Sequence, residues 1–502
     1  MSGSLYSVFA AQAAADRSKT FIERPDGSRI TYGDVDKDTA RIANILSGMG
    51  VAPGDRIAIQ VDKSAEALLL YLACLRLGAV YIPFNTAYTL AELRYLVADA
   101  EPRLFVCRPD RAAEMAELGI QHLRTLGVAG DGTLLEGLAR AETSFADHPC
   151  ANDDLAAILY TSGTTGRSKG AMLSHGNLRS NAEVLKDFWR FTADDRLLHA
   201  LPIFHTHGLF VATNIVAVAG ASMLFLPSFD IEEILRLLPH ASVMMGVPTF
   251  YTRLLAQPGF TADVVKNIRL FISGSAPLAA TTHREFEART GHAILERYGM
   301  TETNMNTSNP YEGERLPGSV GLPLPGTSIR IADPSTGAEV PPGEVGQIEI
   351  KGPNVFKGYW RAPEKTKAEF RADGYFMSGD LGFRDDRGYV HIVGRNKDLI
   401  ISGGFNVYPA EVEAVIDEIE GVAQCAVIGA PHPDFGEAVI AVVVAKPGTQ
   451  LDEGGITATV AERLANYKRP KRIIIVPELP LNTMGKVQKN ILRERHRTVF
   501  QG

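Results

Sequence analysis

Short apolar segments rich in β-branched and aliphatic residues recur along the chain, with helical-period stretches such as ALLLYLACLRLGA and THREFEART between them. The apolar segments are RIAIQV (56–61), RLFVC (103–107), LAAILY (155–160), SMLFL (222–226), SVMMGV (242–247) and RLFISG (269–274). Strands that alternate with helices predict α/β units with largely parallel pairing. Ligands of such sheets bind at the carboxyl ends of strands, where LAAILY and RLFISG run into polar loops.

The pattern of the sequence changes near residue 315, from alternating strands and helices to short strands with close turns. PGSVGLPLPG, SIRIAD, VGQIEIKG and GYVHIVGR are short strands with close turns, which is typical of an antiparallel or barrel-like subdomain. AVIGAPH, AVIAVVVA and KRIIIVPELP then alternate with helical stretches of their own. We therefore predict an α/β protein with a large N-terminal domain at 1–395, a β-rich subdomain at about 315–395, and a smaller α+β C-terminal domain at 396–502.

Length and charge limit the classes of protein that this chain could be. At 502 residues it is too long for one hydrophobic core. A net charge of −7 gives no overall attraction to nucleic acid or anionic lipid. Four widely spaced cysteines without metal-ligand spacing favour reduced thiols, and the N-terminus lacks a signal peptide, so we expect a cytoplasmic protein. The charge-free stretch 208–229 is broken by polar residues and Gly220, which favours a buried helix, a turn and a strand over a membrane span.

Residues 160–170, YTSGTTGRSKG, combine hydroxyl side chains, glycines and Lys169 directly after an apolar strand. Glycines let backbone N–H groups approach a phosphate, hydroxyls donate to it, and the lysine supplies positive charge. The GxxxxGK[ST] template fails here, because neither Gly163 nor Gly166 has a glycine five residues later. Taken alone, such a Gly/Ser/Thr cluster would by default be a solvated polar turn.

This segment is accompanied by YGMTE at 298–302, SGD at 378–380, GR at 394–395 and GK at 485–486. Together, in this order, the motifs resemble the adenylate-forming superfamily of acyl-CoA synthetases, peptide-synthetase adenylation domains and luciferases. The resemblance implies an enzyme that joins a carboxylate to AMP with release of pyrophosphate and then passes the acyl group to a thiol. It also implies ATP as a substrate and Mg²⁺ as a cofactor. The cation is needed because a negatively charged carboxylate attacks the negatively charged triphosphate in the first step.

The resemblance assigns roles to individual residues. Lys486 and Thr301 would act on the α-phosphate, Glu302 would bind Mg²⁺ as a hard oxygen ligand, and Tyr298 would pack on adenine. The expected ATP- and AMP-binding residues are Thr161, Ser162, Gly163, Thr164, Thr165, Lys169, Gly274, Ser275, Ala276, Glu296, Arg297, Tyr298, Gly299, Met300, Thr301, Asp380, Arg395 and Lys486, with Asp380 and Arg395 at the ribose.

Members of the superfamily rotate the C-terminal domain between the two steps, and the hinge residue corresponds to Lys397. The rotation would bring Ser402, Gly403 and Gly404 to the thiol tunnel and withdraw Lys486. No carrier segment with an attachment serine follows residue 495, so we expect free coenzyme A as the thiol. Lys486 is also chemically a target for acetylation, since loss of its charge would mimic its removal.

The acyl pocket is expected around His205, Thr206, His207, Arg284 and Met305. PIFHTHGLF, SGSAPL with THREF, and RYGMTETNMNTSNPY resemble malonyl-CoA synthetases, which also take methylmalonate. On this resemblance Arg284 pairs with the distal carboxylate, while Thr206 and Met305 bound the α-substituent. Alternatively, Arg284 is a surface charge tied to Glu285 or Glu287, and the two histidines are structural.

The segment 200–210, ALPIFHTHGLF, contains no acid that would bind the amine of an amino-acid substrate. We therefore predict an ATP- and Mg²⁺-dependent malonate–CoA ligase with small-molecule partners only. The rival predictions are a ligase for another short or medium carboxylate, a luciferase-like oxygenase, and an inactive nucleotide-binding protein.

Overall fold

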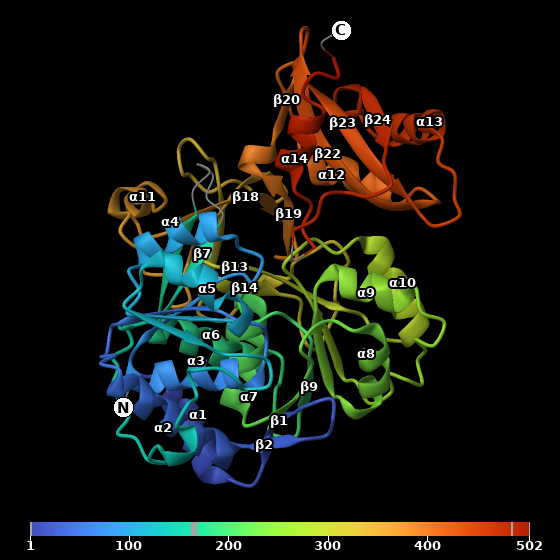
Figure 1. Cartoon of the computed structure of the whole chain (residues 1–502). Helices are drawn as coiled ribbons and strands as arrows, with labels where there is room; N and C mark the ends of the chain where they lie inside the picture. The colour runs from blue at the N-terminus through green and yellow to red at the C-terminus, as the bar shows by residue number, and fades with distance from the viewer. Residues whose placement is uncertain (1–2, 162–167, 483–484, 501–502) are drawn as a thin grey trace.

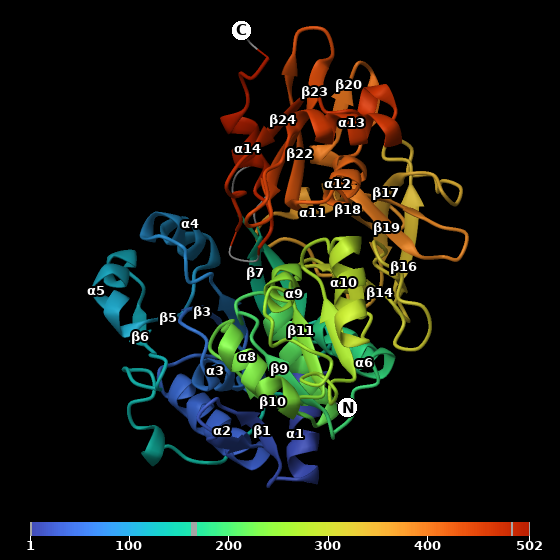
Figure 2. The ribbon, with the colours of Figure 1, turned by 90° about the vertical axis from the view of Figure 1, so that its right-hand side faces the viewer.

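The computed structural model describes residues 3–161, 168–482 and 485–500. Figures 1 and 2 show a large N-terminal body, with the C-terminal part, coloured orange to red, above it. The hydrophobic clusters follow the same division, because those built from residues 400–500 share no residue with the larger N-terminal clusters. The fold is thus mixed α/β with a large N-terminal and a smaller C-terminal domain, as predicted.

A six-stranded sheet in the N-terminal domain has the order β6-β5-β3-β4-β7-β8. Its strands are β3 (Arg56–Gln60), β4 (Val80–Pro83), β5 (Leu104–Cys107), β6 (His122–Thr125), β7 (Leu155–Thr161) and β8 (Lys169–Ser174). All neighbours pair in parallel except β7 and β8. Because this last pair is antiparallel, it holds Thr161 opposite Lys169 at the two ends of the phosphate-type segment.

A nine-stranded sheet forms the second layer, with the order β15-β14-β13-β12-β11-β9-β10-β1-β2. Its strands are β1 (Thr20–Glu23), β2 (Arg29–Thr31), β9 (Arg196–His199), β10 (Ser222–Phe225), β11 (Val243–Gly246), β12 (Leu270–Ser273), β13 (Leu295–Met300), β14 (Asn304–Ser308) and β15 (Leu322–Pro323). The pairs from β1 to β13 are parallel. The carboxyl ends of β9, β12 and β13 therefore share one edge of the sheet.

Two of the N-terminal helices are almost completely buried, α3 (Ala65–Leu77) and α7 (Asn214–Ala219). A π-helical segment, η4 (His207–Thr213), leads directly into α7, and Gly220 then turns the chain with φ 64° into β10. The helix, turn and strand predicted for 208–229 are confirmed. In the part of the chain that the structure describes, no helix is both long and apolar enough to cross a membrane.

The remaining α-helices are α1 (Leu5–Ala15), α2 (Tyr32–Gly48), α4 (Leu90–Ala100), α5 (Ala112–Met115), α6 (His175–Phe188), α8 (Ile231–Leu237), α9 (Pro248–Leu255), α10 (Ala280–Thr290), α11 (Pro363–Ala368), α12 (Pro409–Asp417), α13 (Glu453–Arg463) and α14 (Lys489–Arg495). The last three belong to the C-terminal domain and pack on its sheet, as Figure 2 shows.

The β-rich segment contains a four-stranded antiparallel sheet of β16 (Ser328–Ala332), β17 (Gly346–Lys351), β18 (Phe376–Arg384) and β19 (Val390–Arg395). The C-terminal sheet consists of β20 (Ile400–Ser402), β21 (Phe405–Val407), β22 (Val422–His432), β23 (Gly436–Ala445) and β24 (Arg472–Ile475). Only Asn396–Asp398 and Leu399 separate β19 from β20, so a very short link joins the two domains.

Candidate active site

Side chains that are far apart in the sequence meet near the junction of the two domains. Asp380 on β18 lies opposite Arg395 on β19, and the Arg395 Nε is 3.0 Å from the Asp380 Oδ1. The hydroxyl of Tyr298 donates to the other oxygen of Asp380 at 2.5 Å. Burial, followed by the charge of Asp380, raises the pKa of Tyr298 well above its usual value. The predicted ribose pair is thus assembled, and Tyr298 holds it against β13.

Glu302 follows β13 and is buried, although no lysine or arginine lies at ion-pair distance from it in the described part of the chain. Its Oε1 is 3.1 Å from the hydroxyl of Tyr359 and 3.4 Å from that of Thr161. Burial raises its pKa. A buried carboxylate without a cation fits Mg²⁺, which takes one or two protein carboxylates together with substrate phosphates. Among the described residues no three His, Cys, Asp or Glu side chains converge, so a metal there would depend on the nucleotide for further ligands.

Lys169 contacts two residues that adjoin Glu302. Its Nζ is 3.5 Å from Glu369 Oε1 and 5.0 Å above the ring of Tyr359. Glu369 also binds Lys365 at 2.7 Å and accepts the Tyr359 hydroxyl at 2.6 Å. Burial lowers the pKa of Lys169. Sequence reasoning missed Tyr359 and Glu369, because neither stands in a motif with a chemical signature. Ser162, Gly163, Thr164 and Thr165 lie outside the described residues.

Lys486 of the C-terminal domain lies close enough to Asp380, Arg395 and Glu302 for their charges to act on it. The neighbouring Gly485 packs against Thr249 of α9. Desolvation by the atoms around it, followed by the charge of Arg395, lowers the pKa of Lys486 to about 8. The residue is nevertheless partly exposed to solvent. Asp380, Arg297 and Glu302 also act on its charge. The structure therefore brings the predicted lysine to the predicted nucleotide residues.

Four polar side chains beside this cluster lack complete hydrogen bonding. Thr206 Oγ1, His205 Nε2 and His207 Nε2 have no partner, and neither have Nε and Nη2 of Arg297. His207 Nδ1 lies 3.2 Å from the Ser275 hydroxyl. Burial lowers the pKa of His205 to about 4 and that of His207 well below its usual value, with Arg297 the second cause for His207. Both imidazoles are therefore neutral at pH 7.

Arg297 is the most unusual of these groups. Its side chain is on β13 with only 3% of the residue exposed, and burial lowers its pKa to about 9. Gly274 makes room for it, because a Cβ at that position would lie 2.4 Å from the guanidinium carbon. Buried cations are normally paired or bound to a ligand. The unpaired donors of Arg297 therefore point to an anion that binds from outside the chain.

The other predicted residues of this region take supporting positions. Glu296 is buried and accepts the Leu278 N–H at 3.3 Å, and burial raises its pKa to about 8. Met305 on β14 is buried with its methyl group against Gly299, where a Cβ would lie 2.4 Å from Met305 Cε. Met300 ends β13, Ala276 and Thr301 lie in the adjoining turns, and Ser275 adopts φ 73°.

Arg284 lies elsewhere. It is on α10, 56% of its side chain is exposed, and its Nη2 is 3.4 Å from Glu418 Oε1 of the C-terminal domain. In this structure Arg284 makes its ion pair with Glu418, rather than with Glu285 or Glu287, and its expected pairing with a distal carboxylate stays a prediction. Helical spacing gave its element correctly, whereas the direction of the side chain depends on how α10 packs.

Ser402, Gly403 and Gly404 form the turn between β20 and β21, and Gly403 and Gly404 have φ values of 58° and 82°. Figure 1 shows β20 at the end of the C-terminal domain that is remote from the N-terminal domain. This turn is therefore not near Lys486 or Arg297 in the described arrangement. Lys397 is exposed in the link between β19 and β20.

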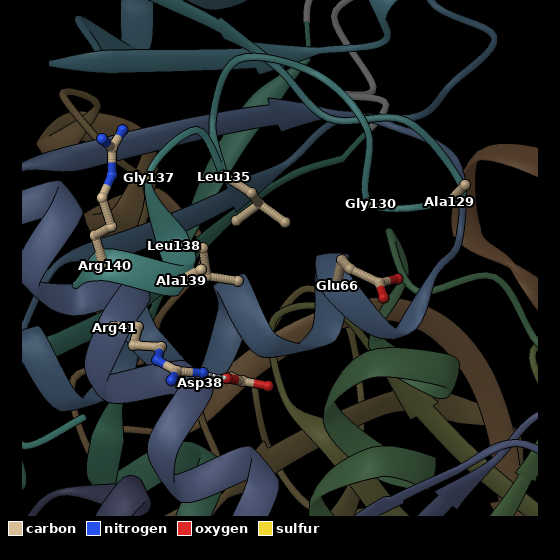
Figure 3. Close-up of a pocket in the computed structure, with 10 residues that line it drawn as sticks. All are labelled: Asp38, Arg41, Glu66, Ala129, Gly130, Leu135, Gly137, Leu138, Ala139 and Arg140. Atoms are coloured by element: carbon tan, nitrogen blue, oxygen red, sulfur yellow. Dashed lines mark hydrogen bonds and ion pairs between the residues drawn. The ribbon is translucent and has the colours of Figure 1, made fainter. Parts of the chain in front are cut away.

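A groove of about 610 Å³ lies apart from this cluster, over α2 and α3 (Figure 3). Its charged side chains already have partners, since Asp38 binds Arg41 at 2.9 Å and Glu66 binds Arg24 at 2.7 Å. Arg41 Nε has no partner, but the same guanidinium is already paired with Asp38 through Nη1, so the groove resembles a surface depression more than a binding site for a charged substrate.

The chain thus has a large α/β domain and a smaller domain, and the Asp380–Arg395 pair of the first lies close to Lys486 of the second. The model of the AMP-binding enzyme family matches residues 9–360, and that of the AMP-binding enzyme C-terminal domain matches residues 411–486. The chain belongs to this family and is an AMP-forming acid–thiol ligase.

The relatives differ in the acid that their names give. The chain is 38% identical to a feruloyl-CoA synthase of Amycolatopsis sp over 94% of its own length and 95% of the relative. It is 34% identical to a malonate–CoA ligase of Arabidopsis thaliana over 98% of its own length and 89% of the relative. The crystal structure of ATP-bound MatB from Rhodopseudomonas palustris is 57% identical, with a TM-score of 0.96 and full coverage of both chains. Membership of the family therefore leaves the acid to be argued from the pocket.

Proposed function

We propose that this enzyme joins malonate to coenzyme A, with conversion of ATP to AMP and pyrophosphate. The observation that carries the proposal is the buried, unpaired guanidinium of Arg297 beside the Ser275 and His207 pair. It lies in the cleft that Lys486 enters. A short acid with a second carboxylate supplies the missing anion, whereas a monocarboxylate leaves the guanidinium unpaired.

Geometry favours a dicarboxylate over other anions for this position. A guanidinium presents its donors as a planar fork, which suits the two oxygens of a carboxylate. Neutral His207 and the hydroxyl of Thr206 add donors without adding charge. Met305 and Thr206 then bound the α-carbon, so we propose that methylmalonate is a second substrate. The resemblance in sequence and the malonate–CoA ligase relative support the same acid.

The opposite carboxylate of malonate would attack the α-phosphorus of ATP. Lys486 and Thr301 are proposed to hold the α-phosphate oxygens, Asp380 and Arg395 the ribose, and Lys169 the terminal phosphates. Glu302 would hold Mg²⁺, which supplies charge neutralisation for the departing pyrophosphate. Tyr359 and Thr161 fix the Glu302 carboxylate on its buried side.

Thioester formation needs another arrangement of the domains. We propose that the C-terminal domain turns at Lys397, so that Ser402, Gly403 and Gly404 replace Lys486 at the cleft and line the path of the coenzyme A thiol. The position of Lys486 in the cleft and of β20 far from it supports an adenylation arrangement for this structure.

Product analysis with ATP, Mg²⁺ and coenzyme A tests the proposal on malonate, methylmalonate, sulfoacetate, acetate and ferulate. We expect AMP and malonyl-CoA in equal amounts, with malonate preferred. Sulfoacetate is the informative rival, because it also has a second anion and a relative from Cupriavidus necator, 33% identical, is a sulfoacetate–CoA ligase. Absence of malonyl-CoA, or a preference for acetate or ferulate, would refute the proposal.

A further inference from the structure

A buried lysine that the proposed mechanism does not use lies behind the acyl pocket. Lys63 is in the loop between β3 and α3, and only 8% of the residue is exposed. No carboxylate lies at ion-pair distance from it among the described residues. Its Nζ instead donates to the His199 carbonyl at 2.8 Å and to His199 Nδ1 at 3.0 Å. The amine also lies 4.2 Å from the ring centre of Phe225.

These contacts connect two sheets at their ligand-binding edge. Lys63 lies three residues after the end of β3 in the six-stranded sheet, whereas His199 and Phe225 end the paired strands β9 and β10 of the nine-stranded sheet. Burial, with no other cause, lowers the pKa of Lys63 well below its usual value. In either protonation state the amine has two protons for the two acceptors of His199, so the geometry does not depend on its charge.

The two ring contacts of His199 fix its tautomer. Because Nδ1 accepts, Nε2 has the proton, and it lies 2.9 Å from the Gly208 carbonyl. Thr213 Oγ1 donates to the same carbonyl at 3.0 Å. Gly208 is in the π-helical segment η4, and a Cβ there would lie 2.1 Å from the Pro202 carbonyl oxygen. Two side-chain donors thus hold one peptide group in a close-packed, irregular helix.

That peptide group adjoins His207, whose Nδ1 meets Ser275 and whose Nε2 is unpaired beside Arg297. π-helical turns frequently occur at functional sites. We propose that Lys63 is a positioning residue for the acid substrate: through His199 and the Gly208 carbonyl, it sets the π-helical segment so that His207 meets the distal carboxylate. This inference rests on the proposed function, since the acyl pocket is its target.

The test compares three variants with the wild-type enzyme. Lys63→Met keeps the apolar stem and removes both donors, and Thr213→Val removes the second donor to Gly208. Gln60→Met is the matched control, because Gln60 is also buried at the end of β3 but binds Asn85, Tyr88 and Arg111, away from η4. For each variant the KM of malonate and of ATP, the malonate to acetate ratio of kcat/KM, and the urea midpoint are measured.

We expect Lys63→Met and Thr213→Val to raise the KM of malonate about fivefold, the effect of about one hydrogen bond, with the KM of ATP unchanged. Gln60→Met should lower the urea midpoint without raising the KM of malonate relative to that of ATP. If Lys63→Met fails to fold, Thr213→Val decides the question alone. Equal changes in both KM values, or no change in either, would overturn the inference.

A second readout does not involve the substrate. Nitrogen-15 NMR of labelled histidine should show the Nε2–H tautomer of His199 in both enzymes, because the Gly208 carbonyl accepts from Nε2. The Nδ1 resonance should shift in Lys63→Met, because Nδ1 loses its donor. An unchanged Nδ1 resonance would contradict the role of Lys63. If the wild-type enzyme does not turn over malonate, the proposed function fails, while the Nδ1 resonance and the KM of the acid that it does accept still test Lys63.

Discussion

Replacement of Arg297 by methionine should have opposite effects on catalysis and on stability. The guanidinium is buried without a complete set of partners, and burial lowers its pKa from 12.5 to about 9. At about 1.4 kcal/mol per pKa unit, this burial costs up to about 5 kcal/mol. The folded pKa is below the unfolded one, so the unfolded chain binds more protons between these values, and the full cost is present at pH 7.

Arg297→Met removes this cost and retains much of the volume, so the ligand-free enzyme should be more stable by about 1–3 kcal/mol, the gain seen when buried ionic groups are replaced by apolar ones. Malonate should lose its partner, because truncation of one side of a buried charge pair costs about 2–5 kcal/mol. The kcat/KM for malonate should therefore fall by at least about thirtyfold, whereas that for acetate should change little.

Pyrophosphate release at a fixed ATP concentration measures both acids, and urea unfolding at pH 7 measures stability. Arg284→Ala is the matched control, since it removes an exposed arginine from the same domain. An unchanged malonate to acetate ratio in Arg297→Met would refute the assignment of the distal carboxylate to Arg297. A large loss of stability in Arg297→Met would contradict the view that the guanidinium lacks a partner in the ligand-free enzyme.

Three further predictions concern the domain contacts and the lysine of the C-terminal domain. Lys486→Ala should reduce adenylation by at least about a hundredfold, as loss of a stabilising donor does, yet spare thioester formation from supplied malonyl-AMP; equal losses would contradict the domain rotation. Because the pKa of Lys486 is lowered to about 8, its ammonium is lost as the pH rises, so kcat/KM for adenylation should decline above about pH 8. Thioester formation should lack that decline, and a shared decline would point to another group. Arg284→Ala should leave kcat/KM for malonate within about fivefold, because an exposed ion pair contributes at most about 1 kcal/mol, and a larger malonate-specific loss would return Arg284 to the pocket.

The sequence predicted the layers of the fold well, because local pattern decides them. The segments at 155–160 and 269–274 are in the strands β7 and β12, as predicted. Pattern alone did not reveal that these strands belong to different sheets. That arrangement depends on long-range pairing, which no window of sequence contains.

The candidate site shows the same limit at the level of side chains. Asp380 and Arg395 were predicted as a pair, and their strand register brings them together. Arg284 and Arg297 are both arginines next to recognised motifs, and only packing distinguishes the exposed helix position from the buried strand position. Lys63 stands in a polar segment, VDKSAE, that resembles a surface loop, so its burial could not be foreseen.

The most direct test of the account is the specificity of the wild-type enzyme for malonate over acetate, measured as kcat/KM for acyl-CoA formation by mass spectrometry. A buried guanidinium satisfied by one acid and left unpaired by the other should give a ratio of at least about thirtyfold. A ratio near one, or a preference for acetate, would contradict the claim that the pocket is built for a second carboxylate.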